Sequence, residues 1–352
     1  MSEPITEQVR TLMERHAGSG FSGVGLVKRG ETEILHEAYG LAHRGFGIPN
    51  TVATRFDIAS VTKTFTAASI LQMIEAGELA LDTRVMPFLG IAGTRISDDV
   101  TVYHSLTHTS GIGDDADEEA GEDYEALFID KPNYSIRETA DFLPQFVDKD
   151  PNFAPGEGVR YNNVAFVLLG LVIEKATGMP YRDYVRQNVF ARAGMTGADF
   201  CAMDGVHPNL AEHYKKIEHD DGQVEWRKNI YSYPPIGSPD GGATVTALDL
   251  DRFVRAIVAG KLLGPEWTER FLAPQVKQKD LDGGGAAWIG FAFEFKLDSE
   301  GAIIHMDKEG ENAGVDSLIA YFPASDTTVV LLANVGYSVW TMLREIEPLL
   351  AG

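Results

Sequence analysis

The chain has 352 residues, of which 44% are hydrophobic and 10% aromatic, a composition typical of a folded protein with one large or two interleaved domains. Its formal net charge of −22 at pH 7 argues against nucleic acid and anionic membranes as partners, because both attract basic proteins. The single cysteine, Cys201, excludes an intrachain disulfide and a cysteine metal cluster.

The N-terminal segment MSEPITEQVR carries acids and has no apolar signal-peptide core, so we expect a cytoplasmic location for the sequence as given. The longest apolar segment, 164–173, is too short to span a bilayer. These observations predict no membrane partner, and they leave the oligomeric state open.

The first 77 residues read as a helix, a hairpin and a second, strongly apolar helix. Periodicity predicts the first helix over 5–16, and two strand-like runs, 23–30 and 32–39, predict the hairpin. The second helix starts near Ser60 and stops at Gly77, a residue suited to a left-handed C-terminal cap. Its apolar positions surround most of its circumference, which indicates burial on nearly every side.

Lys63 is the only formal charge between residues 60 and 74. An unpaired ammonium in such surroundings is costly and tends to release its proton. Ser60 lies three residues earlier, on the same helix face and at a helix start that favours a developing anion. A serine beside such a lysine is an activated acyl-transfer nucleophile. Taken alone, the Ser-x-x-Lys pattern favours a plainer reading, a capping serine and a lysine reaching water, because it occurs by chance about once in a chain of this size.

The middle of the chain reads as mainly helical, with an acidic run at 114–125. The run is either a solvated loop or helix start, or an acidic flap that repels anionic ligands. His104 and His108 are four residues apart but lack the glutamate of a His-Glu-x-x-His motif, so we expect local hydrogen bonding rather than metal binding. The expected elements are a short helix at 101–111, helices at 137–148, 163–176 and 181–193, and pocket-lining loops at 200–235.

The C-terminal part switches to period two and short apolar runs, typical of antiparallel strands. We expect a helix at 248–258, strands at 290–295, 302–305, 317–322 and 328–333, and a last helix at 338–350. The predicted fold is α/β (α+β), with an antiparallel sheet from both termini flanked by helices and an inserted, mainly helical domain. The predicted domains are 1–75 with 236–352 for the sheet and 76–235 for the helices, with the active site between them.

Two further patterns have chemical potential. Tyr161-x-Asn163 precedes an apolar helix, where a tyrosine beside a cationic lysine favours its phenolate and could exchange a proton with the serine; a packed tyrosine with asparagine caps is the alternative. Lys308-x-Gly310 lies among the C-terminal strands, where glycine admits a substrate backbone and lysine supplies charge.

In this order, Ser60-x-x-Lys63, Tyr161-x-Asn163 and Lys308-x-Gly310 resemble the motifs of the penicillin-binding-protein-like serine hydrolases. That group includes class C β-lactamases, DD-peptidases, D-aminopeptidases and β-lactamase-like esterases. The resemblance covers nearly the whole chain and includes the segments 21–27, 55–66, 105–112, 161–170 and 241–250.

The resemblance implies that Ser60 is the acylated nucleophile and that Lys63 and Tyr161 share the proton transfers. Asn163 would position the acyl side chain and Lys63, and Lys308 would support the electrostatics around Tyr161 and the substrate. Gly310 would bind the substrate by letting its backbone approach closely. The backbone N–H groups of Ser60 and Glu311 would form the oxyanion hole. The resemblance implies no cofactor and no metal. Which of Lys63 and Tyr161 is the base belongs to the coupled pair and is left open.

Glu309 departs from the family pattern, because relatives that process β-lactams or D-Ala peptides usually have threonine or serine between this lysine and glycine. A glutamate facing the cleft would repel a substrate carboxylate, whereas strand alternation could instead turn it outward. We therefore expect a small-molecule ester or amide as the partner. A β-lactamase or DD-peptidase/D-aminopeptidase acting on β-lactams or peptides is one alternative, and a slowly deacylating ligand-binding or sensor protein is the other.

Overall fold

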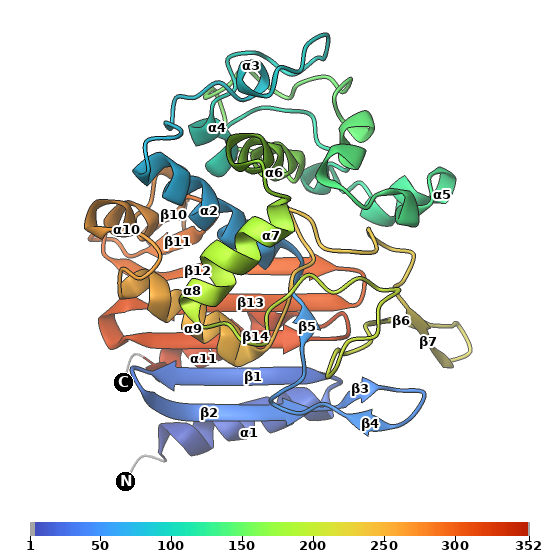
Figure 1. The fold of residues 1–352 in the computed structure, drawn as a ribbon. Helices are drawn as coiled ribbons and strands as arrows, with labels where there is room; N and C mark the ends of the chain where they lie inside the picture. Colours follow the sequence, from blue (N-terminus) through green and yellow to red (C-terminus); the bar gives the residue numbers. More distant parts are fainter. Residues whose placement is uncertain (1–3, 351–352) are drawn as a thin grey trace.

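The computed structural model describes residues 4–350, apart from the side chain of Glu118, so the first three residues of the segment considered for a leader lie outside it. Within the described residues, an eight-stranded antiparallel sheet has the order β2-β1-β14-β13-β12-β11-β10-β9 (Figure 1). The strands are β1 (Gly23–Arg29), β2 (Thr32–Tyr39), β9 (Val276–Asp280), β10 (Ala286–Ile289), β11 (Glu294–Leu297), β12 (Ile303–Asn312), β13 (Val315–Phe322) and β14 (Thr327–Ala333). Strand β1 pairs with β14, which confirms a sheet built from both ends of the chain.

The two faces of this sheet are covered by different helices (Figure 1). Helices α1 (Ile5–Gly18) and α11 (Val339–Leu350) pack on one face, over apolar side chains such as Leu318 and Leu331. Helices α2 (Lys63–Glu75) and α9 (Ala247–Val258) pack on the other, over side chains such as Ile319. Because β13 and β14 are covered on both sides, every residue in them is buried, which explains their unbroken apolar runs.

The helical region lies beyond α2 and is centred on α6 (Val164–Thr177), which is buried along most of its length. The other helices of this region are α3 (Val85–Leu89), α4 (Val102–Leu106), α5 (Leu127–Asp130) and α7 (Tyr181–Val185). Helix α8 (Ala191–Ala193) lies beside α9, and α10 (Pro265–Phe271) is also nearer the sheet. Helix α2 therefore separates the sheet from the helical region, as Figure 1 shows. The element order is compatible with the boundaries 1–75 with 236–352 and 76–235, and we retain that division as a proposal.

Three local predictions need correction. In the run at 290–295 only Glu294 and Phe295 belong to a strand, β11, because Gly290 N–H bonds to Phe293 O and closes a turn between β10 and β11. Residues 200–235 do line a cavity, as expected, but they also contain an unpredicted hairpin, β6 (Tyr214–Glu218) with β7 (Val224–Lys228). The helix expected at 137–148 is a 3-10 helix, Thr139–Gln145, with a proline inside it. The remaining short strands are β3 (Leu41–His43), β4 (Ile48–Pro49), β5 (Phe56–Asp57) and β8 (Thr244–Val245).

No single helix in the described part of the chain has the length and apolarity needed to cross a bilayer. Helix α6 meets that test only when joined to the segment Tyr181–Ala193, and the two are bent by 79°. The apolar character of α6 is explained by its place in the core.

Candidate active site

The turn that carries Ser60 has a strained backbone. Strand β5 leads into a 3-10 turn, Ala59–Thr62, and then directly into α2. Ala59 has a φ of 41°, in the left-handed region that costs energy for any residue with a side chain. Its N–H donates to Asp57 Oδ1 at 2.7 Å and its carbonyl accepts from Gly242 N–H at 3.3 Å. Burial raises the pKa of the Asp57 carboxyl to about 6, while the Ala59 N–H opposes that shift.

Lys63 is completely buried, and its ammonium points at the serine. Its Nζ donates to Ser60 Oγ at 2.9 Å, to Asn163 Oδ1 at 2.8 Å and to the Asp240 carbonyl oxygen at 2.6 Å. Three acceptors match the three N–H donors of an ammonium, so the buried charge is satisfied. The alternative of a lysine that extends to water is wrong.

The start of α6 places Asn163. Asp114 caps this helix, accepting from Asn163 N–H at 2.8 Å and from Val164 N–H at 3.1 Å. Asn162 also caps it, through a 2.7 Å bond from Ala165 N–H to its Oδ1. The asparagine cap considered from the sequence therefore applies to Asn162, whereas the side chain of Asn163 accepts a hydrogen bond from Lys63.

The ring of Tyr161 lies close to two lysines. Its centre is 5.1 Å from Lys63 Nζ and 4.7 Å from Lys308 Nζ. Lys308 also pairs with Glu294 Oε1 at 3.1 Å. The structure thus brings together Lys63, Tyr161 and Lys308, which are separated by about 100 and 150 residues in the chain.

Gly310 lets β12 pass directly beside the Ser60 turn. A Cβ at this position would lie 2.1 Å from the Ile58 carbonyl oxygen and 2.9 Å from Ser60 N, closer than real side chains come. Ser317 Oγ, on the neighbouring strand, donates to Ile58 O at 2.8 Å and to Gly310 O at 3.0 Å. The backbone of β12 before Glu311 therefore lies against the backbone N–H of Ser60.

The side chain of Glu309 faces away from this site. Glu309 pairs with Leu318 and Lys308 pairs with Ile319, and these partners belong to the cores on opposite faces of the sheet. Burial raises the pKa of Glu309, while a hydrogen bond with Trp340 of α11 opposes the shift. Glu309 is therefore turned outward, and its expected repulsion of a substrate carboxylate does not apply.

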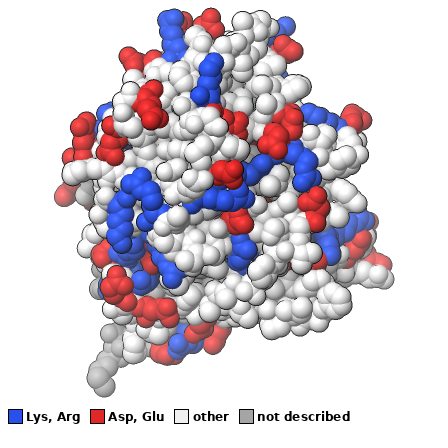
Figure 2. Space-filling view, in the orientation of Figure 1, with Lys and Arg blue, Asp and Glu red and all other residues white. Residues whose placement is uncertain are grey.

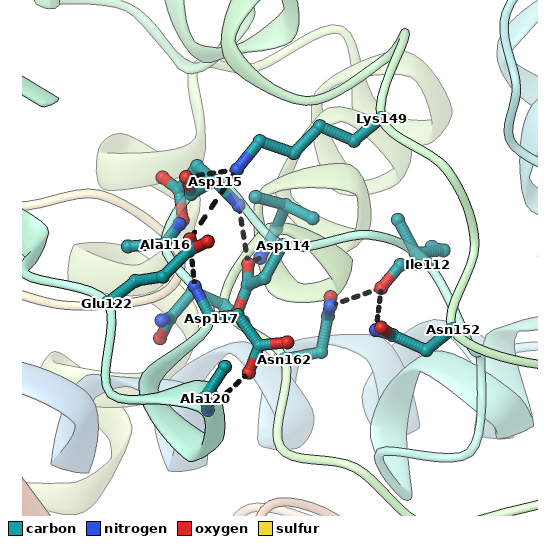
Figure 3. Close-up of polar contacts among 12 residues, drawn as sticks. Ile112, Asp114, Asp115, Ala116, Asp117, Ala120, Glu122, Lys149, Asn152 and Asn162 are labelled. Carbon is teal, nitrogen blue, oxygen red and sulfur yellow. Dashed lines mark hydrogen bonds and ion pairs between the residues drawn. The ribbon is translucent and has the colours of Figure 1, made fainter.

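Ser60 opens into a cavity of about 940 Å³, whose lining includes Asn163 and Glu311. The acidic run at 114–125 has two parts with different surroundings. Its start is structural, since Asp114 and Asp115 are buried and Asp114 caps α6, whereas residues 121–125 line the cavity. Figure 3 shows how the two parts are joined: Lys149 Nζ donates to Asp115 O at 2.5 Å, and Asp117 N–H donates to Glu122 Oε2 at 2.9 Å.

The sequence did not indicate three contributors to this site. The Asp240 acceptor is a backbone carbonyl, which carries no side-chain signal. Asp114 was read only as part of a charge run, and His108, which stacks on Tyr161, only as a local hydrogen-bonding residue. Within the described residues, no group of three or more His, Cys, Asp or Glu side chains is placed to hold a metal ion.

The chain is similar to known proteins along nearly its whole length. The solved penicillin binding protein from Bacillus halodurans is 38% identical, with a TM-score of 0.88, over 97% of this chain and 99% of that one. Penicillin-binding protein 4 of Amycolatopsis lactamdurans is 27% identical over 334 residues, 90% of this chain and 83% of that protein. Esterase EstB of Burkholderia gladioli is 36% identical over 189 residues, only 51% of this chain and 47% of the esterase.

The family model described as Beta-lactamase matches residues 6–347, which include the whole sheet, the helical region and the Ser60 site. One of these relatives, EstB, is named an esterase, which is a hydrolase. The chain belongs to the Beta-lactamase family and is a serine hydrolase of that family.

Proposed function

We propose that this protein hydrolyses carboxylic esters or small amides through an acyl-enzyme on Ser60. The observation that carries the proposal is the 2.9 Å hydrogen bond between a fully buried Lys63 and Ser60 Oγ, at the wall of a 940 Å³ cavity. At this distance the neutral form of the amine can accept the hydroxyl proton.

In the proposed reaction Ser60 Oγ attacks the substrate carbonyl, and its proton passes to the Lys63–Tyr161 pair. The carbonyl oxygen becomes an anion that the backbone N–H groups of Ser60 and Glu311 stabilise. The same pair returns the proton to the departing alcohol or amine, which leaves the acyl group on Ser60. Water then attacks the ester and gives one proton to the pair, which returns it to Ser60 Oγ as the acid product leaves. The pair titrates as a unit, so the base is assigned to both residues together.

Asn163 and Lys308 support this pair. Asn163 fixes the Lys63 amine through the 2.8 Å hydrogen bond and borders the cavity, where an acyl side chain would lie. Lys308 keeps a positive charge 4.7 Å from the Tyr161 ring centre, which favours the phenolate form of the tyrosine.

The preference for esters and small amides rests on what β12 presents to the cavity. Glu309 points to α11, so no hydroxyl stands between Lys308 and Gly310 to bind a substrate carboxylate. The lining carries Glu122, Asp123 and Glu311, which disfavour anionic substrates. The lysines of the β6–β7 hairpin do not reverse this charge, since Lys215 and Lys228 are paired with glutamates.

We expect p-nitrophenyl esters of short and medium acids, or D-amino acid amides, to be turned over, and Ser60→Ala to abolish turnover while the protein stays folded. The panel includes nitrocefin, because the Bacillus halodurans relative is named a penicillin binding protein. Fast turnover of nitrocefin with no ester or amide hydrolysis would reverse the proposed preference. Intact mass after incubation with an ester or a penicillin separates a hydrolase from a sensor, since a persistent adduct without turnover identifies the latter.

A further inference from the structure

His108 lies directly against the ring of Tyr161. The two ring centres are 4.6 Å apart with planes inclined by 29°, a stacked arrangement. The imidazole also contacts the ring of Phe166 from α6, and the two ring centres are 5.3 Å apart. His108 is 2% exposed, so Tyr161 rests on a buried support rather than on solvent.

The backbone on both sides of Tyr161 is also tied to His108. Arg160 N–H donates to the His108 carbonyl oxygen at 2.9 Å, and Asn162 N–H donates to His108 Nδ1 at 3.1 Å. Together with the stacking, these bonds fix the residue before Tyr161, its ring and the residue after it. The side chain and the backbone carbonyl of His108 thus together fix the position of the Tyr161 phenol.

His108 occupies this place at an energetic cost. It follows the C-terminus of α4 with a φ of 56°, in the left-handed conformation where glycine is usually favoured. With Nδ1 accepting from Asn162, a neutral ring carries its proton on Nε2, and that atom is buried with no hydrogen-bond partner among the described residues. Strain and an unsatisfied buried donor are costs that accumulate at functional sites.

The imidazole stays neutral beside the two lysines. Burial, followed by the positive charges of Lys308 and Lys63, holds the pKa of His108 well below its usual value. A neutral ring keeps Nδ1 free to accept from Asn162, and it adds no positive charge to the Lys63–Tyr161 pair. His108 is therefore not suited to be the acid or the base of the reaction.

We propose that His108 is a positioning residue for Tyr161, holding the phenol ring close to Lys63 and Lys308 by stacking and by two backbone hydrogen bonds. This inference rests on the proposed function, in which Tyr161 shares the proton transfers. His104 does not take part, because its Nδ1 accepts from Thr101 N–H at 3.2 Å within the cap of α4.

The test is a double-mutant cycle of His108→Ala and Tyr161→Phe, measured with an ester that the wild type hydrolyses. We expect His108→Ala to lower kcat/KM about 10- to 100-fold, mostly in kcat, because a displacement of about 1 Å costs that much. The pH profile of kcat/KM should shift, since it reports the Lys63–Tyr161 pair. The double variant should be no slower than Tyr161→Phe alone, because both changes act through one group.

His108→Asn keeps an acceptor near the Nδ1 position and tolerates a positive φ, so it should recover part of the loss. The same cycle run with His108→Asn decides the matter if the alanine variant does not fold. His104→Ala is the matched control and should lower Tm without shifting the pH profile. Losses that add in the cycle, or a His108→Ala enzyme with the wild-type rate and pH profile, overturn the inference. A fully active Tyr161→Phe enzyme would instead remove Tyr161 from the proposed function, and the inference with it.

Discussion

Lys63 shows how one residue reconciles burial with charge. A buried unpaired ammonium would cost several kcal/mol or lose its proton, yet here three oxygen atoms surround it. Two of these acceptors, from Asn163 and Asp240, lie far from Lys63 in sequence and hold the amine in place. The third is Ser60 Oγ, so the same geometry that makes the charge tolerable also directs it at the proposed nucleophile.

At the same scale, Gly310→Ala should damage activity more than stability. The added Cβ would lie 2.1 Å from Ile58 O and 2.9 Å from Ser60 N, so β12 and the Ser60 turn must separate. We expect kcat/KM for the best ester to fall by at least about 100-fold, because donor and nucleophile geometry is lost together. The measurement is kcat/KM beside the free energy of unfolding from urea titration.

Gly18→Ala is a suitable control, since nothing lies within 4 Å of the Cβ it would gain at the end of α1. It should leave kcat/KM unchanged. If Gly310→Ala retained wild-type kcat/KM, the close approach of β12 to Ser60 would have no role in catalysis.

At the scale of elements, α6 connects the acidic run to the active site. Asp114 accepts from the first N–H groups of the helix, and those N–H groups belong to Asn163 and Val164. A carboxylate at a helix N-terminus also interacts favourably with the helix dipole. The cap therefore sets the position of the side chain that binds Lys63.

Asp114→Ala should lower the free energy of unfolding by about 1–2 kcal/mol, the usual value of a helix cap. It should also lower kcat, because Asn163 is no longer anchored. Thr246→Ala is the matched comparison: Thr246 caps α9 through Asp249 N–H at 3.2 Å, and it should lose similar stability with no loss of kcat. Equal kcat in the two variants would contradict the coupling of the cap to the site.

The elements also show what could be predicted from sequence. β13 and β14 could be predicted because strands buried on both faces have continuous apolar runs. Helix α2 could be predicted because apolar residues repeat around nearly its whole circumference. The alternating phenylalanines at 291–295 misled the prediction, since Phe291 and Phe293 are core residues of a turn. The β6–β7 hairpin was missed because it is short and rich in charge.

For the site, spacing alone linked Ser60 to Lys63, since both lie within one helical turn. The approach of Tyr161, Asn163, Lys308 and Gly310 depends on tertiary contacts, and only the family resemblance indicated it. The direction of Glu309 depends on strand register, and the Asp240 acceptor is a carbonyl, so neither had a sequence signal.

At the scale of the whole molecule, the charge of −22 is unevenly distributed. Figure 2 shows Lys and Arg side chains gathered in a band across the middle of one face, with acids beside them. Ion pairs such as Arg186–Asp199 and Arg255–Asp326 place opposite charges together in the helical region and at α9. A different arrangement holds beneath α11, where the carboxyls of Asp316, Glu309 and Glu311 form a partly buried group.

Asp316 is the clearest member of that buried group. Burial, followed by the negative charges of Glu309 and Glu311, raises the pKa of its carboxyl to about 8, while the backbone N–H groups of Val339 and Tyr337 oppose the shift. The folded protein therefore keeps a proton on Asp316 that the unfolded chain releases near pH 4. The stability that this proton contributes is complete below about pH 4 and is lost as the pH rises through 8, with a slope of about 1.4 kcal/mol per pH unit.

Asp316→Asn should remove this slope, because the amide keeps an acceptor for the α11 N–H groups and carries no charge at any pH. We expect its Tm to match the wild type at about pH 4, to exceed it increasingly as the pH rises to about 8, and to keep a constant lead above that pH in thermal unfolding experiments. Asp220→Asn, at an exposed site, makes the same change in net charge and should follow the wild-type curve. If the two variants gained equally at high pH, the effect would come from the net charge of the whole molecule. A Tm difference confined to Asp316→Asn would locate the pH-dependent loss of stability under α11, on the strands that border the Ser60 site.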